Sequence, residues 1–210
     1  MNYWFTSDSH LGHKNILKYC GRTIFMTPQD KRMYETLGVD KLKRYIMSDE
    51  SLDNMNKGII KRWNERVKED DIVFCIGDFC FRNSSVDKGE GIRIRANEWE
   101  SKLNGKIIHI KGNHDKNNST KTIIERLVIG YGGKRINLVH NPEHADLNFP
   151  INFCGHVHEK WQIKRIYDKN RYKFTDIINV GCDVWEFMPV KFEELMKRYY
   201  QWLRNTENKS

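Results

Sequence analysis

Residues 3–10 of this 210-residue chain have the sequence YWFTSDSH, an apolar run typical of a β-strand that ends in Asp8, Ser9 and His10. Four later apolar runs, residues 72–76, 107–110, 136–139 and 151–154, are also followed by polar residues that could bind ligands. Those residues are Asp78, Asn113, His114, Asp115, His140, His156 and His158. Strand ends are where α/β sheets gather ligands, so the five clusters together predict one polar site.

Strand-like and helix-like segments alternate along the chain, which predicts an α/β fold in one domain. A hairpin is expected around Asp168-Lys169-Asn170, between strands at residues 161–166 and 171–174, with a further strand at 177–180. Residues 22–51 are long, mixed in charge and placed between the first two clusters, so we expect them to form a lid-like insertion. Helices are expected at residues 14–19, 52–67, 91–103, 119–129 and 190–203.

Composition narrows the classes of function. The five cysteines form no Cys-x-x-Cys pair, and the N-terminus lacks the pattern of a secretory leader, so we expect a cytoplasmic protein with free thiols. No apolar run approaches the ~20 residues of a membrane span, so no membrane partner is expected. The net charge of +8, from 36 basic and 28 acidic residues, would attract phosphorylated molecules or nucleic acid.

The types and spacing of the polar residues indicate metal chemistry. Alternate residues of an extended strand end point to one side, so Asp8 and His10 can reach one ion. His156 and His158 can do the same, or their rings can diverge onto neighbouring ions. Gly77, Gly112 and Gly155 each precede one of the clusters and permit a tight turn with close backbone approach. Carboxylate, imidazole and amide donors suit Mn²⁺, Fe²⁺/Fe³⁺ or Zn²⁺ rather than Ca²⁺ or Mg²⁺. Two such ions ~3.5–4 Å apart would neutralise a phosphate ester and activate water to cleave it.

The ordered set Asp-x-His, Gly-Asp, Gly-Asn-His-Asp, His and Gly-His-x-His resembles the calcineurin-like metallophosphoesterase superfamily. The resemblance covers residues 4–181 and ends on Asn179-Val180-Gly181. Residues 8–16 and Arg62-Trp63-Asn64 are similar to small stand-alone bacterial and phage members. The fold that the resemblance implies is a β-sandwich flanked by helices, in α/β/β/α layers, with the site at the strand ends.

The resemblance also implies a role for each residue. Asp8, His10 and His158 would hold one ion, Asn113, His140 and His156 the other, and Asp78 would bridge them. His114 would stabilise the phosphoryl group or protonate the leaving oxygen, with Asp115 orienting its ring. Manganese is the favoured metal, with iron or zinc as alternatives. The reaction would be in-line attack of a metal-bridging hydroxide on a phosphomonoester or phosphodiester.

The fourth motif departs from the family pattern, in which a glycine usually follows the histidine. Here His140 is followed by Asn141-Pro142, and His144 lies close by. We favour His140 as the ligand because it ends an apolar strand, whereas His144 lies beyond a proline in a loop.

Three further residues are candidates for substrate binding. Arg22 and Arg82 could clamp phosphate through the guanidinium fork, although surface solvation is the favoured interpretation for each arginine alone. His13 could bind phosphate or pack against the first helix. His109 lies within a predicted strand and is expected to be structural.

Three functional interpretations stay open. The first is a phosphoesterase acting on a phosphorylated small molecule or nucleotide. The second is a nuclease or nucleic-acid end-processing phosphatase, which the net charge and the basic clusters at residues 41–44 and 160–173 favour. The third is a non-catalytic binding scaffold, which would show degenerate ligand positions, whereas all seven metal-ligand positions are filled. The sequence favours neither monoesters nor diesters and indicates no oligomeric state.

Overall fold

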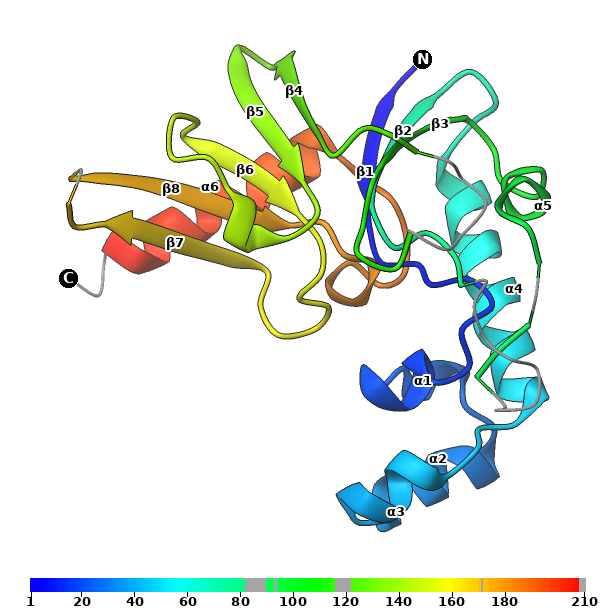
Figure 1. The fold of residues 1–210 in the computed structure, drawn as a ribbon. Coiled ribbons are helices and arrows are strands. Elements are labelled where there is room, and N and C mark those ends of the chain that lie inside the picture. The colour runs from blue at the N-terminus through cyan, green and yellow to red at the C-terminus, as the bar shows by residue number, and fades with distance from the viewer. Residues whose placement is uncertain (82–89, 93, 116–121, 171, 208–210) are drawn as a thin grey trace.

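Two mixed β-sheets flanked by helices form the protein, as the sequence predicted (Figure 1). The computed structural model describes residues 1–81, 90–92, 94–115, 122–170 and 172–207. The first sheet has the strand order β3-β2-β1-β9, and the second has the order β4-β5-β6-β8-β7. The strands are β1 (Tyr3–Thr6), β2 (Ile72–Ile76), β3 (Lys106–Ile110), β4 (Arg126–Tyr131), β5 (Lys134–Val139), β6 (Ile151–Cys154), β7 (Ile163–Asp168), β8 (Lys173–Asn179) and β9 (Val190–Lys191).

Parallel pairing brings the polar clusters together. β1, β2 and β3 are parallel neighbours, so the residues that follow them leave the first sheet at the same edge. β5, β6 and β8 are parallel neighbours in the second sheet, and their carboxyl ends also share an edge. The five clusters predicted from the sequence therefore follow strands that end on the same side of their sheets.

The two sheets share a core of aromatic and aliphatic side chains. Phe5 of β1 stacks on Phe74 of β2, with 5.3 Å between ring centroids, and meets Phe153 of β6 edge-on at 5.0 Å. Because alternate strand residues face opposite sides, Phe74 faces this core while Val73 and Cys75 face the helices. Burial on both faces explains why the β2 run is apolar throughout.

Helices cover the outer face of the first sheet. The long helix α4 begins after Ser48, whose hydroxyl accepts a hydrogen bond from the Ser51 N–H (3.1 Å). It buries Met55, Ile59 and Trp63 at helical spacing against the sheet. The helices are α1 (Ile16–Tyr19), α2 (Pro28–Thr36), α3 (Val39–Arg44), α4 (Asp49–Arg66), α5 (Ala96–Glu100) and α6 (Phe192–Glu207), with short 3₁₀ turns at η1 (Thr23–Phe25), η4 (Pro142–His144) and η5 (Cys182–Val184).

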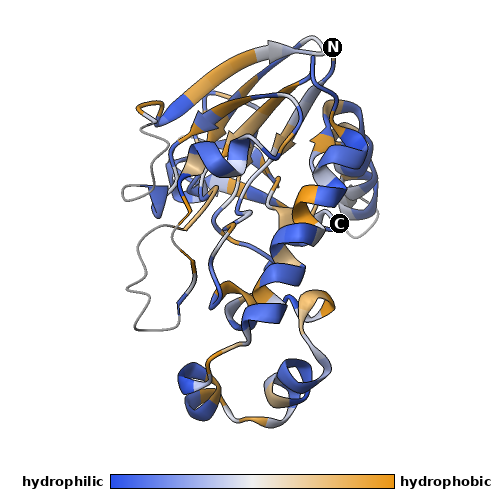
Figure 2. Cartoon of the chain, turned by 90° about the vertical axis from the view of Figure 1, so that its right-hand side faces the viewer, coloured by the Kyte–Doolittle hydropathy of each residue, from blue (hydrophilic) through white to orange (hydrophobic). Residues whose placement is uncertain are grey.

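Residues 28–44, here called the arm, form the helices α2 and α3 and project from the sheets at the bottom of Figure 1. Most of the ribbon of these two helices has the colour of hydrophilic residues in Figure 2. The base of the arm is fixed by Asp30, which is 1% exposed and accepts hydrogen bonds from the Ser48 N–H (2.9 Å) and the Tyr45 hydroxyl (2.7 Å). The segment expected to be a lid-like insertion, residues 22–51, thus contains η1, α2, α3 and the start of α4. Lid function stays a prediction.

Several predicted boundaries differ from the structure. The helix expected at residues 119–129 is wrong where the chain is described, because Arg126–Tyr131 is strand β4, paired antiparallel with β5. Apolar residues at 123, 124, 127 and 128 fit helical spacing, but pairing along β5 stabilises the extended form. The hairpin around Asp168 is confirmed, although the two strands expected after it are one strand, β8. Among the described residues, no helix has the length and apolar character needed to cross a bilayer.

Candidate metal centre

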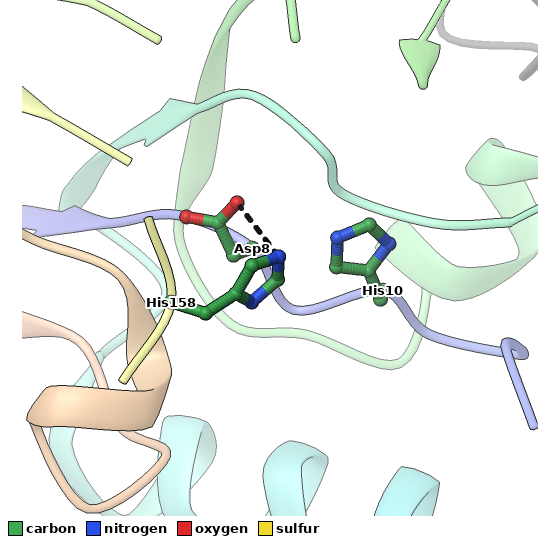
Figure 3. Close-up of side chains that lie close together, drawn as sticks. All are labelled: Asp8, His10 and His158. Atoms are coloured by element: carbon green, nitrogen blue, oxygen red, sulfur yellow. Dashed lines mark ion pairs between the residues drawn. The ribbon is translucent and has the colours of Figure 1, made fainter. Parts of the chain in front are cut away.

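Asp8, His10 and His158 lie together at the carboxyl end of β1 (Figure 3). One donor atom from each residue lies within 4.8 Å of the other two. The Oδ1 atom of Asp8 is 3.9 Å from Nε2 of His158, and the His10 and His158 rings stack with 5.2 Å between centroids. Asp8 and His10 are 0% and 1% exposed. These three residues could hold one metal ion.

A second group adjoins the first. Asp8, Asp78 and His140 also bring their donor atoms within 4.8 Å of one another. Oδ2 of Asp78 lies 3.3 Å from Nε2 of His140 and 3.6 Å from Nε2 of His10, so this carboxylate stands between the two groups. Oδ1 of Asn113 lies 3.0 Å from Nε2 of His140 and 2.9 Å from Nδ1 of His156. The structure therefore gathers all seven predicted ligands, and His140, rather than the exposed His144, is the histidine in the cluster.

The backbone at the ligands is unusual. Among the described residues, eight non-glycine residues have a positive φ, and five of them are predicted ligands: Asp8 (58°), His10 (47°), Asp78 (52°), His156 (71°) and His158 (49°). Such conformations cost free energy and cluster at functional sites, where the surroundings hold them. The His156 N–H, for example, donates to both carboxylate oxygens of Asp8 at 3.0 Å.

All three glycines have the predicted close approach, and a Cβ atom at Gly112 would collide with Asp78. A Cβ atom at Gly77 would collide with the His140 ring, and one at Gly155 would collide with the Asp8 carboxylate and the Ser7 hydroxyl. Gly77 also has a φ of 88°. None of the three positions leaves room for a side chain, because the ligands pack directly against the backbone.

Three observations fit these residues to bound cations. Both ring nitrogens of buried His10 lack a hydrogen-bond partner among the described residues, and an unpartnered buried polar atom is costly. Burial raises the pKa of the Asp8 carboxyl, because removal from water disfavours its charged form, and a cation bound beside it would offset that cost. The mixed nitrogen and oxygen donors also match the preferences of Mn²⁺, Fe²⁺ and Zn²⁺.

The pKa values of His140 and Asp78 in the second group are set by burial and by their mutual contact. Burial alone would lower the pKa of His140, but its hydrogen bond to Asp78 and the negative charges of Asp8 and Asp78 raise that pKa to about 9. Burial would raise the pKa of Asp78, yet the same contact with His140 and the charge of His10 lower it. Positive charge on His140 therefore stabilises the ionised form of Asp78, and the negative charge of Asp78 stabilises protonated His140.

The predicted acid, His114, is exposed and borders the cluster. Its backbone N–H donates to Oδ1 of Asp78 (2.9 Å), and its ring centroid is 5.4 Å from that of His10. The Asp115 carboxylate accepts hydrogen bonds from the N–H groups of Asp78 (2.9 Å) and Gly112 (2.7 Å). These contacts join the turns after β2 and β3, while orientation of the His114 ring by Asp115 stays a prediction.

The substrate-binding candidates have different surroundings. Arg22 is 1% exposed and makes its contacts in the interior, so a phosphate clamp at this residue does not fit the structure. His13 is 7% exposed and stacks on Phe81 with 4.0 Å between centroids, and burial lowers its pKa to about 3, which favours a neutral packing role. Arg82 lies outside the described residues. His109 has the expected structural contact, with its Nε2 2.9 Å from Glu100.

Two residues at the site were missed by sequence reasoning. Asp183 lies in η5 with its Oδ2 3.0 Å from Nδ1 of His158. The Ser7 hydroxyl donates to the Asp8 carboxylate at 2.6 Å and lies 2.7 Å from the Ile76 carbonyl. Asp183 follows the end of β8, so the strand-end rule that found the other ligands also applies to it. Ser7 carries no comparable signal, because serine before a ligand is common.

Comparison with known proteins shows which family the chain belongs to. The chain is 30% identical over 201 residues to the uncharacterized protein MJ1445 of Methanocaldococcus jannaschii, covering 92% of this chain and 89% of that protein. This chain belongs to that protein's family. No family model matches the sequence.

Solved structures support the fold. A protein of unknown function from Aquifex aeolicus, AQ665, aligns over 93% of this chain and 97% of its own length, with a TM-score of 0.57 and 19% identity. A Streptococcus pneumoniae protein described as a predicted phosphoesterase aligns over 85% of this chain and 71% of its own length, with 18% identity and a TM-score of 0.34. The alignment with AQ665 shows the shared fold.

Proposed function

We propose that this protein is a metal-dependent phosphoesterase with two divalent ions. The observation that carries the proposal is the convergence of seven carboxylate, imidazole and amide side chains from separate strand ends. They surround a buried His10 whose ring nitrogens have no hydrogen-bond partner among the described residues. Asp8, His10 and His158 would hold one ion and Asn113, His140 and His156 the other, with Asp78 between them. When bound, such ions neutralise phosphoryl oxygens and lower the pKa of bound water.

The chain's own residues would supply the remaining functions. The His114 ring is exposed at the border of the cluster, and the contact between its backbone and Asp78 fixes its position relative to the ligands. It would give a proton to the leaving oxygen of the ester, a contribution typically worth ~10²–10⁴-fold. Asp115 would keep the turns that carry Asp78 and His114 in register through its hydrogen bonds to backbone N–H groups.

The substrate panel that tests this proposal uses metal-free protein reconstituted with Mn²⁺. It contains aryl phosphomonoesters and diesters, cyclic nucleotides, nucleotides, and short DNA and RNA. We expect hydrolysis of at least one phosphate ester that is lost on chelation and lost in Asp78→Asn. A matched variant at a distant buried carboxylate, Asp176→Asn, should retain it. No metal-dependent hydrolysis of any ester in the panel would contradict the proposal.

A nuclease is the second candidate, favoured by the net charge of +8 and by exposed Lys164 and Lys173 on the β7–β8 hairpin. Salt dependence separates the two candidates. Contacts along a nucleic-acid backbone release counterions, so affinity falls steeply with ionic strength. A small-molecule ester should respond weakly over the same range of salt.

A further inference from the structure

Arg22 is a fully buried arginine with every N–H directed at a partner inside the protein. Nε and one terminal nitrogen donate to the two carboxylate oxygens of Asp183 at 2.8 and 2.9 Å, a bidentate fork. The same terminal nitrogen donates to the Asp8 carbonyl (2.7 Å), and the other donates to the Ser9 carbonyl (3.0 Å) and to Sδ of Met55 (3.5 Å). These contacts use all five guanidinium N–H groups.

The backbone that Arg22 holds is the strained segment of the first metal group. Asp8 and His10 both have a positive φ, and the two carbonyls bound by Arg22 belong to Asp8 and to Ser9, the residue between them. Hydrogen bonds to charged donors are stronger than neutral ones. One buried guanidinium can therefore fix the conformation that points both ligands toward the same place.

Asp183 connects the arginine to the third member of that group. Its Oδ2 accepts from Arg22 and lies 3.0 Å from Nδ1 of His158, whose Nε2 lies on the side of Asp8. A carboxylate that accepts the Nδ1 proton of a histidine fixes the ring and leaves Nε2 free to bind metal. The Asp183 side chain is 2% exposed, so Arg22 supplies the positive charge that this carboxylate needs.

We propose that Arg22 and Asp183 form a buried positioning pair that sets Asp8, His10 and His158 to receive one metal ion. The proposal rests on the proposed function, because it assumes that this group binds metal. Neither residue is catalytic, since each acts through the ligands that it holds. The pair joins segments 161 residues apart in the sequence, the turn after α1 and the turn after β8.

The chain offers a matched control. Arg165 and Asp176 form a second bidentate pair, with Nε and a terminal nitrogen donating at 2.7 and 2.8 Å to a carboxylate that is 0% exposed. This pair joins β7 to β8 and contacts Tyr199 of α6 instead of the metal ligands. The Arg165 side chain is 39% exposed, so substitution of Asp176 tests the general cost of removing a buried carboxylate from a bidentate Arg–Asp pair.

The experiment titrates Mn²⁺ into metal-free protein by calorimetry and compares Asp183→Asn with Asp176→Asn. Loss of a carboxylate that orients a metal-binding histidine typically weakens metal binding 10–100-fold. In Asp183→Asn, we expect the affinity for one of the two ions to fall by about that factor and the affinity for the other to stay unchanged. In Asp176→Asn, the affinity for both ions should stay unchanged. Arg22→Lys, which keeps the charge but loses the fork, should weaken the same ion, whereas Arg165→Lys should not.

One outcome would overturn the positioning role but not the proposed function: the wild type binds two ions, and Asp183→Asn binds Mn²⁺ with unchanged affinity. Wild-type protein that binds no Mn²⁺ would overturn both. A second measurement needs no variant and remains decisive if a substitution prevents folding. Nitrogen-15 NMR of histidine rings in metal-free wild-type protein should show the His158 proton on Nδ1, and a neutral His158 protonated only on Nε2 would overturn the proposal.

Discussion

The substitution His10→Phe should stabilise the metal-free protein while weakening its response to metal. His10 is 1% exposed, and neither ring nitrogen has a hydrogen-bond partner among the described residues. Leaving a buried donor or acceptor unpaired costs about 1–3 kcal/mol. A phenyl ring removes that cost at nearly the same volume, so we expect a gain of about 1–2 kcal/mol in the free energy of unfolding. For a chain of this size, each kcal/mol shifts the Tm by about 2–4 °C.

Urea unfolding with chelator and with excess Mn²⁺ provides the assay. An ion that binds only the folded state stabilises it by about 2.7 kcal/mol at 100 times its Kd. With chelator, wild-type protein should therefore be less stable than His10→Phe. With excess Mn²⁺, it should be more stable than His10→Phe. The control is His109→Phe, in which the ring loses its 2.9 Å contact with Glu100. That variant should lose about 0.5–1.5 kcal/mol in both conditions.

Two results would refute this reasoning. If His10→Phe is less stable than the wild type with chelator, then the unpaired imidazole does not destabilise the metal-free protein. If Mn²⁺ stabilises both proteins equally, His10 does not contribute to metal binding.

Three further predictions concern the acid, the arm and the pH dependence of stability. His114→Ala should retain its metal content but lose ~10²–10⁴-fold in kcat on esters with poor leaving groups, and less on aryl esters. Equal losses on both kinds of ester would instead indicate that His114 stabilises charge on the phosphoryl oxygens. Asp30→Ala, which removes the acceptor that fixes the arm, should speed amide hydrogen exchange in residues 28–44 without changing metal content, and a changed KM would support lid function. Four hydrogen bonds, from Asn2, Trp4 and Lys68, lower the pKa of buried Asp71 below its ordinary 3.8 despite its desolvation. The stability that this carboxylate contributes is present above pH 3.8 and is lost as the pH falls toward the pKa of the folded state. Asp71→Asn should therefore narrow the difference in urea midpoint between pH 7 and pH 3. An unchanged difference would contradict this role of Asp71.

The fold was predictable where local pattern and tertiary context agree. The apolar runs before Asp8, Asp78 and His156 all form strands, because fully buried strands in parallel pairs require continuous apolar sequence. The segment from residue 122 onward was not predictable in this way, since its apolar spacing also fits a helix. Pairing with β5 decides the conformation of Arg126–Tyr131, and single-sequence periodicity contains no information about that partner.

Part of the candidate site was predictable from the sequence and part was not. Ligand identity follows from residue type at strand ends, and the structure brings those residues within contact distance of one another. The role of Arg22 could not be inferred, because an arginine in a sequence is more often solvated than buried. Only the folded chain shows that its partner is Asp183 and that its other donors hold the backbone of the first ligands.

The central claim is that these ligands form a site for two ions, and metal content tests it most directly. Protein reconstituted with Mn²⁺ and freed of excess metal should contain two equivalents per chain by elemental analysis. Asp78→Asn should lose more metal than Asn113→Ala, because Asp78 is a charged ligand placed between the two groups. A reproducible value near zero in the wild type, after reconstitution with either Mn²⁺ or Zn²⁺, would contradict the account.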